Sequence, residues 1–413
     1  MSAKHKYGPQ EIKAFFAKVD WDFADAWTRY GLNLIHWYPT KLAPQVASKL
    51  IAGLSGRGDI VLDPFCGSGT VLAEAMRLGR HSIGIDISPL ACMIATARTT
   101  LIPLPKLDVR LTTFLETVRF GLELLNHSVL PLPTTHGEKE ALALIRSSRQ
   151  QPINTELSKW FHPDVYRDIC FVTECIALEP DKGINLLLTT TLSSLLRTCC
   201  SQPRSWGYIA DNVAPKQYIY KNIYNLLVKR IRALKLGMQM SIEQCALSGL
   251  NIQEANKLTT VIVGDTRHIT AVPPESVDCI VTSPPYANVS DNVTSQRLSM
   301  LWLGYDVDTI KQMEIGARWK RFRKESLENY VVEMQQSLAQ MWSLLKLGGR
   351  LALILGSSPK WEHRYSTLIA IDSHVRKQLK MEELATFSRK LPATRQHGSH
   401  GVMDENIFVY RKK

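Results

Sequence analysis

The sequence predicts an α/β fold, a mostly parallel sheet with helices on both faces, interrupted by a largely helical insertion. Three observations lead to this prediction. Short apolar segments typical of buried strands alternate with segments of helical spacing at both ends of the chain. This alternation stops between about residues 101 and 257, where helical spacing prevails. Two of the apolar segments are followed at once by turns that carry polar groups. The chain therefore divides into residues 1–100, 101–257 and 258–413, of which the first and third parts form the sheet.

The composition predicts a soluble globular protein with an excess of positive charge. The chain has 413 residues, 45% of them hydrophobic, and its 50 lysines and arginines exceed its 38 acidic residues by 12. This length suffices for one large α/β domain with an inserted module. The excess favours a polyanionic partner or an anionic membrane surface. No apolar run approaches the roughly 18 residues of a membrane span, and the N-terminus lacks a signal-peptide core, so we expect a cytoplasmic protein.

The cysteines do not predict a metal site. All eight are scattered, with neither a Cys-x-x-Cys pair nor the accompanying histidine spacing of a zinc site. We expect them to be reduced, mostly buried small hydrophobes.

A glycine-rich turn follows the first predicted strand, residues 59–63. It reads Asp63-Pro64-Phe65-Cys66-Gly67-Ser68-Gly69-Thr70 and leads into a helix predicted over 71–78. Gly67 and Gly69 let the backbone approach a ligand that a Cβ would exclude. The helix N-terminus at Thr70 adds unpaired amide donors. The turn therefore predicts one side of a nucleotide-binding site.

The second predicted strand, residues 82–86, ends in an acidic residue. Asp86 lies about twenty residues beyond the glycine turn, where a carboxylate can hold ribose hydroxyls. The alternative interpretation is a tight connection between strand and helix, with a solvated Asp86.

The second polar turn follows the apolar run 277–281 and reads Thr282-Ser283-Pro284-Pro285-Tyr286. Ligands of open α/β sheets bind beyond the carboxyl ends of the strands. The two prolines fix φ and remove two backbone donors, which aims the Ser283 hydroxyl and the Pro284 carbonyl beside an aromatic face. This set suits a flat ring that bears an exocyclic amine. Taken alone, the tetrad is also compatible with an ordinary turn.

The remaining elements complete the predicted sheet. Residues 36–44 form a turn-like segment, and the strand over 260–265 again ends in Gly-Asp. The other expected elements are helices over 46–54, 297–304, 326–345 and 368–379, and strands over 350–356, 381–388 and 406–410.

The middle of the chain is rich in basic residues. Residues 101–133 are apolar and punctuated by prolines, 134–154 form a polar and flexible link, and helical segments follow over 184–196 and 221–236. Lysines and arginines interleaved with aromatics predict a surface that follows phosphates, whereas a solvated helix face is the alternative. The candidates are Arg197, Lys216, Lys221, Lys229, Arg230 and Arg232, with a second basic and aromatic cluster at Arg318, Lys320, Arg321 and Arg323.

The combination of the glycine turn, Gly84-Ile85-Asp86, Gly264-Asp265 and the Ser-Pro-Pro-Tyr tetrad resembles the amino-group DNA methyltransferases, specifically the cytosine N4 type. The resemblance implies a Rossmann-like methyltransferase fold with a seven-stranded sheet, the cofactor S-adenosyl-L-methionine and double-stranded DNA as partner. It leaves open a cognate restriction endonuclease as a further partner. Many relatives carry the tetrad before the glycine turn, whereas here the turn comes first. The insertion precedes the Gly264-Asp265 strand, so its role in target recognition stays open.

The family also implies roles for individual residues. The segment with Thr40 and Lys41 would meet the methionine carboxylate of the cofactor, and Asp63 would lie near its ammonium group. Asp86 would hold the ribose and Asp265 the adenine edge. The residues that would shape the pocket are Phe65, Cys66, Gly67, Gly69 and Thr70.

For catalysis, the family implies the tetrad Ser283, Pro284, Pro285 and Tyr286. Tyr286 would stack on a flipped base. Ser283 and the Pro284 carbonyl would accept hydrogen bonds from its amine, which then attacks the sulfonium methyl in line.

Several other functions share parts of this pattern. Adenine N6 methylation uses the same geometry, although its enzymes more often have Asp at the position of Ser283. Guanine N2 methyltransferases of transfer RNA share a Pro-Pro-Tyr core. Carbon methylation needs a thiolate, usually in a Pro-Cys dipeptide, which this sequence lacks. A nicotinamide oxidoreductase leaves the tetrad unexplained, and a non-enzymatic nucleic-acid-binding module leaves both pockets unexplained.

Overall fold

The structure is a computed structural model. It describes residues 8–24, 30–39, 41–126, 136–147, 155–202, 215–356, 366–391, 402 and 404–413.

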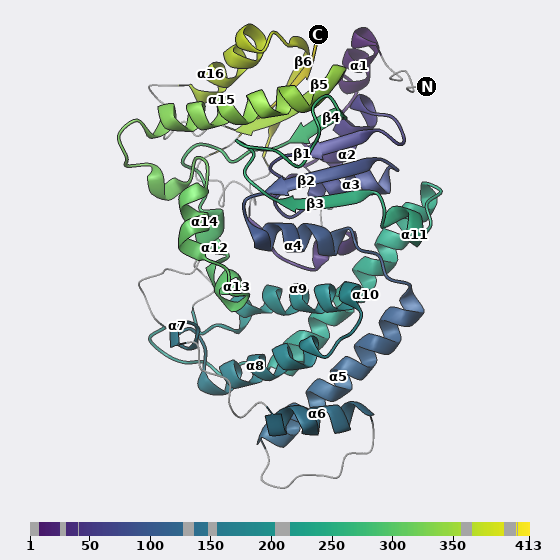
Figure 1. Cartoon of the computed structure of the whole chain (residues 1–413), viewed down its shortest axis with the longest axis vertical. Coiled ribbons are helices and arrows are strands. Elements are labelled where there is room, and N and C mark those ends of the chain that lie inside the picture. Colours follow the sequence, from purple (N-terminus) through teal and green to yellow (C-terminus); the bar gives the residue numbers. More distant parts are fainter. Residues whose placement is uncertain are drawn as a thin grey trace.

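A seven-stranded sheet forms the upper body of the molecule in Figure 1, with the strand order β3-β2-β1-β4-β5-β7-β6. Strand β7 runs antiparallel to both of its neighbours, and the other paired strands are parallel. The predicted mostly parallel Rossmann-like fold is therefore confirmed. The strands are β1 (Ile60–Asp63), β2 (His81–Asp86), β3 (Thr259–Val263), β4 (Val277–Thr282), β5 (Leu345–Gly356), β6 (Glu382–Lys390) and β7 (Asp404–Arg411).

The strand order reverses direction between β1 and β4. From β1 the chain adds β2 and β3 on one side, and it returns to place β4 on the other side. Such a switch point opens a crevice at the carboxyl ends of the two central strands. The glycine turn follows β1 and the Ser-Pro-Pro-Tyr tetrad follows β4, so both predicted motifs lie at this crevice.

Alternate residues of each central strand face opposite layers of helices, because side chains of a strand point alternately to the two faces. Val61, Cys279 and Ala352 pack with α1 (Pro9–Phe16), α2 (Pro44–Leu54) and α3 (Thr70–Arg77). Leu62 and Ile280 pack with α15 (Ser326–Leu344) and α16 (Thr367–Ser373) on the other face. Helix α4 (Pro89–Arg98) lies along β2 and β3.

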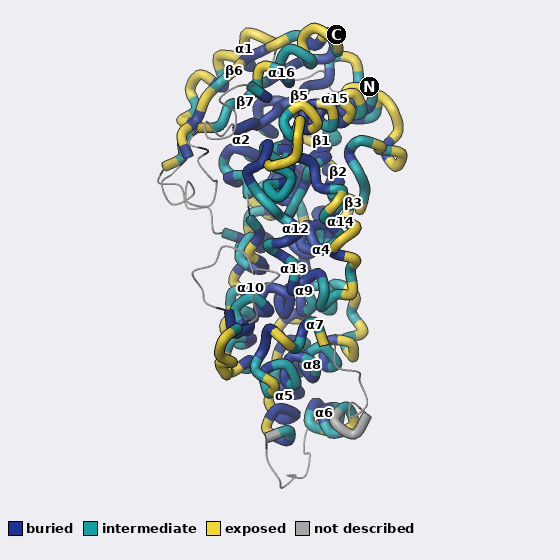
Figure 2. The backbone as a smooth tube through the Cα atoms, turned by 90° about the vertical axis from the view of Figure 1, so that its left-hand side faces the viewer, coloured by how far each residue is buried: buried dark blue, intermediate teal, exposed yellow. Residues whose placement is uncertain are grey.

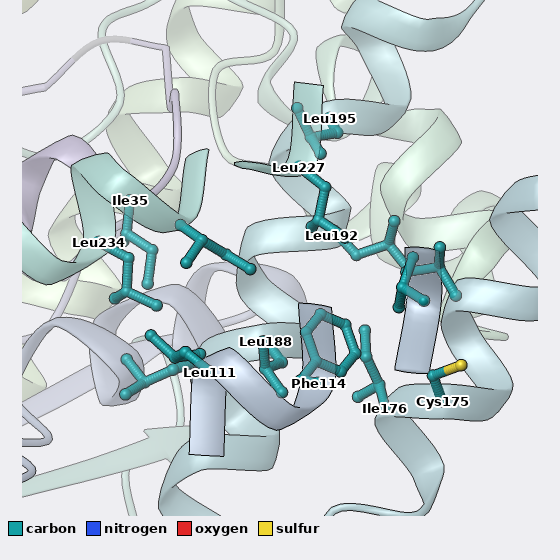
Figure 3. Packing of buried hydrophobic residues seen from close by; sticks show 14 of the residues in the cluster. Ile35, Leu111, Phe114, Cys175, Ile176, Leu188, Leu192, Leu195, Leu227 and Leu234 are labelled. Carbon is teal, nitrogen blue, oxygen red and sulfur yellow. The ribbon is translucent and has the colours of Figure 1, made fainter. Parts of the chain in front are cut away.

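The insertion is a helical layer below α4 in Figure 1. Its helices are α5 (Leu104–Asn126), α6 (His136–Ser147), α7 (Thr155–Ser158), α8 (Pro163–Ala177), α9 (Lys182–Cys199), α10 (Ile223–Leu247) and α11 (Ile252–Ala255). Their apolar side chains, among them Leu111, Phe114, Leu188 and Leu234, form one cluster, drawn in Figure 3. Met76 of α3 and Ala97 of α4 belong to the same cluster, so the insertion packs firmly on the sheet body. In Figure 2 buried residues occur both in the sheet body and in this helical layer.

Two expectations for residues 101–154 were wrong or incomplete. The proline-punctuated stretch contains the 23-residue helix α5, whose Pro105 stands in the first turn, where proline's missing N–H costs nothing. The expected flexible link contains helix α6, which packs against α5. Ala141 of α6 is fully buried. The apolar residues of α6, Ala141 to Ile145, form a short run between polar segments, so the helix did not stand out in the sequence.

Beyond β4 the chain forms α12 (Asn292–Ser295), α13 (Arg297–Trp302), α14 (Val307–Met313) and the short η3 (Arg318–Lys320) before α15. Within the described ranges, every helix is too short or too polar to span a lipid bilayer.

Candidate active site

A direct hydrogen bond joins the ends of β1 and β4. The Thr282 hydroxyl donates to Asp63 Oδ1 at 2.7 Å, and the Phe65 backbone N–H donates to the same oxygen at 3.2 Å. Asp63 is 3% exposed, and its burial raises its pKa to about 7. The two motifs, some two hundred residues apart in the sequence, therefore share one buried carboxyl group.

The glycine turn wraps around the carboxylate at the end of β2. Gly67 N–H donates to Asp86 Oδ2 and Ser88 N–H donates to Oδ1, both at 2.9 Å. Gly67 (φ +48°) and Gly69 (φ +79°) both have left-handed backbone conformations. A Cβ on Gly69 would lie 2.7 Å from Ala95, so the turn needs glycine there.

Asp86 keeps the capacity to bind a ligand. Burial raises its pKa to about 6, although the two backbone N–H groups act against this rise. Each carboxylate oxygen accepts one backbone bond and retains a further lone pair. Two hydroxyls of one sugar could therefore donate to this side chain.

The segment before α2 closes the site from the other side. A Cβ on Gly67 would lie 3.4 Å from the Tyr38 ring, so Tyr38 faces the glycine turn. The His36 carbonyl accepts from the Lys41 ammonium at 2.9 Å and from the Arg98 guanidinium at 3.0 Å. Lys41 thus fixes the segment in its place. Thr40, predicted beside it, lies outside the described residues.

Arg98 of α4 is a buried cation behind the glycine turn. Its guanidinium donates to the Ser68 carbonyl at 2.8 Å and to the Ser68 hydroxyl at 2.6 Å, in addition to His36. The side chain is 1% exposed, and burial lowers its pKa to about 9. Arg98 therefore ties the turn to the N-terminal segment.

The tetrad contains a chain of hydroxyl groups. Tyr286 OH donates to Glu405 Oε1 of β7 at 2.8 Å, and Ser283 Oγ lies 3.1 Å from Tyr286 OH. Because the phenol hydrogen is used on Glu405, the Ser283 hydroxyl must donate to the phenol oxygen. The tetrad backbone is also held, since Tyr330 OH donates to the Pro285 carbonyl at 3.0 Å. The lone pairs of Ser283 therefore remain available as acceptors.

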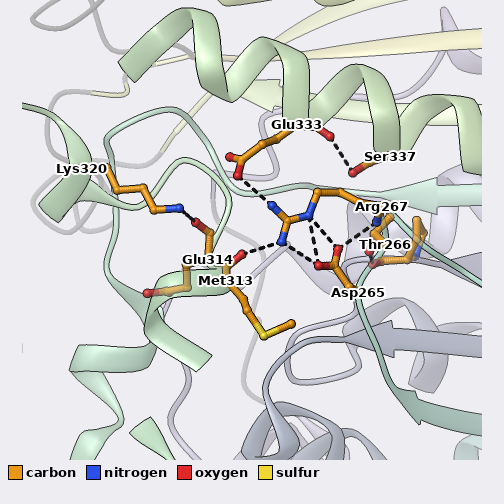
Figure 4. A network of polar contacts seen from close by, with 9 residues as sticks. Asp265, Thr266, Arg267, Met313, Glu314, Lys320, Glu333 and Ser337 are labelled. Atoms are coloured by element: carbon orange, nitrogen blue, oxygen red, sulfur yellow. Dashed lines mark hydrogen bonds and ion pairs between the residues drawn. The ribbon is translucent and has the colours of Figure 1, made fainter. Parts of the chain in front are cut away.

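Asp265 lies just beyond β3, but its carboxylate pairs with an arginine. The Arg267 guanidinium donates to both carboxylate oxygens, at 2.6 to 3.1 Å, and also reaches Glu333 of α15 at 2.7 Å (Figure 4). These bonds lower the pKa of Asp265 against the opposing effect of its burial. The carboxylate has little capacity left for a ligand in this arrangement, so its predicted contact with adenine stays a prediction.

Cys66 has the environment of a pocket-lining residue. It is 5% exposed, and its contact with Cys92 together with burial holds the pKa of its thiol well above the usual range. A protonated thiol is a poor nucleophile. Phe65 is half-buried beside it, and Thr70 begins α3.

The residues predicted to contact phosphates differ in their partners and in their exposure. Several of them contact other groups of the protein. Arg197 stacks on Trp37, Lys221 donates to the Thr198 and Cys200 carbonyls, and Lys320 donates to the Glu314 carbonyl. Arg230, Arg318 and Arg321 are half-buried, whereas Lys216, Lys229, Arg232 and Arg323 are exposed.

Sequence reasoning missed three residues of this site. Tyr38, Arg98 and Glu405 reach it through contacts between distant segments, and no local motif marks them. The place of Glu405 near the tetrad depends on the pairing of β7 with β5, so it could not be recognised before that pairing was known.

Comparisons with known proteins find similarity to methyltransferases. Residues 5–97 match the family model of DNA methylases, a range that includes the glycine turn and Asp86. The type II methyltransferase M.MjaII of Methanocaldococcus jannaschii is 22% identical over 406 residues, covering 82% of this chain and 75% of that protein. M.MvaI of Kocuria varians is 25% identical over 329 residues, covering 76% and 67%. Among solved structures, the rRNA methyltransferase AviRa of Streptomyces viridochromogenes aligns with a TM-score of 0.35 at 12% identity, covering 95% of this chain and 94% of that one.

Proposed function

We propose that this chain, which is related to the S-adenosylmethionine-dependent amino-group DNA methyltransferases, methylates the exocyclic N4 amine of cytosine in double-stranded DNA. The observation that carries the proposal is the hydroxyl chain from Ser283 through Tyr286 to Glu405. In this chain the Ser283 hydroxyl donates its hydrogen to Tyr286. Its oxygen, just beyond the end of β4, is left as a hydrogen-bond acceptor.

An acceptor at this position suits amine chemistry. The lone pair of an exocyclic amine is delocalised into the ring, so the amine is a weak nucleophile. Ser283 Oγ and the Pro284 carbonyl would accept its two protons, which favours tetrahedral nitrogen and localises the lone pair. The site would then act by positioning and preorganised electrostatics, without a covalent enzyme intermediate.

The cofactor is S-adenosyl-L-methionine, which supplies an electrophilic methyl group. The residues at the end of β2 fit its ribose, because Asp86 retains lone pairs on both oxygens. Tyr38 lies against Gly67, 3.4 Å from the position that a Cβ there would take, and would form one wall beside the bound cofactor. Asp63 lies where β1 and β4 meet, between the two halves of the site.

The alternative acceptor is the N6 amine of adenine. Both amines can donate two protons to the same pair of acceptors, so the hydroxyl chain does not distinguish them. Serine rather than aspartate at position 283 is the feature that favours cytosine.

The assay is transfer of radiolabelled methyl groups to duplex DNA, followed by digestion to nucleosides. We expect the wild-type protein to place the label in N4-methylcytosine, and Ser283→Ala to do so about 100-fold more slowly. Label in N6-methyladenine would establish the alternative acceptor. Label in RNA alone, or in no nucleic acid, would exclude the proposed function.

A further inference from the structure

Phe322 is the most exposed aromatic side chain among those of the described residues, at 79%. It lies just after η3, in the segment between α14 and α15 that we call the 316–324 loop. Arg321 stacks on its ring with a distance of 4.2 Å to the centroid, and Arg323 and Lys324 follow in exposed positions. A large apolar ring among cations suits a partner that combines negative charge with stacking surfaces.

The loop is attached to the segment that follows the tetrad. Asn288 N–H donates to the Gly316 carbonyl at 2.8 Å, and Arg318 N–H donates to the Ser290 carbonyl at 3.1 Å. Trp319 N–H donates to the Asp291 carboxylate at 2.9 Å. Phe322 is therefore carried on a loop whose position relative to Ser283 and Tyr286 is fixed by backbone bonds.

The residues of the loop that precede Phe322 pack against the protein, whereas Phe322 itself is exposed. The Lys320 ammonium donates to the Glu314 carbonyl at 2.5 Å (Figure 4), and the Arg323 guanidinium lies 4.3 Å from the Trp319 ring. Gly316 has φ +62°, and a Cβ there would lie 2.7 Å from Tyr330, the side chain that holds the Pro285 carbonyl. The loop and the tetrad thus share one support.

We propose that Phe322 inserts into the DNA duplex and fills the space that the target base leaves when it turns into the tetrad pocket. This inference rests on the proposed function. A base inside a duplex is out of reach of an enzyme site, and its extrusion leaves neighbouring bases unstacked. Apolar side chains are known to enter between base steps of a duplex. An aromatic ring in the vacated position could stack on the neighbouring bases. Arg321, stacked on the ring, would lie against the adjacent phosphates.

The test compares single-turnover methyl transfer at saturating DNA on two duplexes that contain the mapped target cytosine. In one it is paired with guanine, and in the other it is mismatched, which makes extrusion easier. We expect Phe322→Ala to slow transfer at least about fivefold on the paired duplex, the lower end of one base–aromatic stack. We expect it to match wild type within about twofold on the mismatch, where little stacking energy is needed for extrusion. Phe322→Trp, which keeps a stacking face, should retain the wild-type rate on both.

A direct readout uses 2-aminopurine in place of the target cytosine, since its fluorescence rises when it leaves the stack. Phe322→Ala should reduce this rise, whereas Leu347→Ala, which truncates an equally exposed residue at the start of β5, should not. The proposal would be overturned if Phe322→Ala left the rise in 2-aminopurine fluorescence unchanged. It would also be overturned if this variant slowed methyl transfer equally on both duplexes. Absence of transfer by wild type on either duplex would instead overturn the proposed function, and this inference with it.

Discussion

At Ser283 the direction of one hydrogen decides whether the side chain offers an exocyclic amine a lone pair or a proton. Glu405 accepts from Tyr286, and this leaves Ser283 to donate inward. Ser283→Ala should slow methyl transfer by about 100-fold, the usual loss for one preorganised hydrogen-bonding group. Tyr286→Phe keeps the ring but frees the Ser283 hydroxyl, so a smaller loss of about tenfold is expected. Single-turnover rates measure both.

The matched control is Tyr410→Phe. Tyr410 is a buried tyrosine of the same strand that carries Glu405, and its hydroxyl donates to a carboxylate, Asp372, at 2.7 Å. Its loss should lower stability by about 1 kcal/mol and leave the transfer rate unchanged. If Tyr286→Phe weakened cofactor binding as much as it slowed transfer, the orienting role of Tyr286 would be refuted.

Asp86 gives the site a pH dependence with a definite sign. Its pKa is raised to about 6 by burial, and only the ionised form can accept from two ribose hydroxyls. Affinity for S-adenosylmethionine should therefore be constant above about pH 7 and fall as the pH drops through 6. Titration calorimetry between pH 5 and 8 measures this affinity, with Asp86→Asn as the control.

The Asp86→Asn protein should bind more weakly and lose this pH dependence. A second buried carboxyl group, Asp63, has a pKa of about 7 and lies at the same edge of the sheet. A transition centred near pH 7 that survives in Asp86→Asn would assign the effect to Asp63 instead.

At the scale of elements, α4 is coupled to the glycine turn by a side chain that no motif marks. Arg98 donates to three acceptors, the carbonyl and hydroxyl of Ser68 and the carbonyl of His36. Water cannot reach these acceptors in the buried interface. Arg98→Met should leave them unpaired, with a loss of about 1–3 kcal/mol in the free energy of unfolding and a weaker cofactor affinity. Denaturant unfolding with and without S-adenosylmethionine measures both.

A surface arginine serves as the control for Arg98. Arg119 of α5 pairs with Glu123, and both side chains are 50% exposed, so Arg119→Met should cost at most about 0.5 kcal/mol and leave cofactor affinity unchanged. Equal losses in the two variants would mean that Arg98 has no special role at the turn.

The elements near the site could be predicted from the sequence because their signals are local. The apolar runs at 60–63 and 277–282 are buried strands, and the polar residues after them define the ends of β1 and β4. The insertion was predicted to be largely helical, but α5 and α6 were not located, because prolines stand around the first and polar segments flank the second. Glu405 could not be assigned either, since its role depends on the pairing of β7 with β5. Local motifs thus marked the strand ends at which the candidate site lies, and long-range packing supplied the residues that support it.

At the scale of the whole molecule, the basic residues predicted to contact phosphates lie in two regions, the helical layer and the 316–324 loop. Helix α10 carries exposed Lys229 and Arg232, whereas Arg230 between them is half-buried. The loop adds exposed Arg323 and Lys324, and backbone bonds attach it to the segment that follows the tetrad. If one duplex contacted both regions, phosphate contacts on α10 would position the DNA and the loop would act at the target base.

Charge reversal on α10 tests whether the helical layer contacts the duplex. Lys229→Glu with Arg232→Glu should weaken DNA binding and reduce the dependence of log K on log salt by about 0.9 for each phosphate that the protein no longer neutralises. Titrations between about 50 and 200 mM salt measure that slope. Lys13→Glu with Lys18→Glu makes the same charge change near α1, at the top of the molecule in Figure 1 and apart from α10, and corrects for net charge. Equal changes of slope in the two double variants would leave α10 as an ordinary solvated helix face, with the duplex held by the loop beside the tetrad.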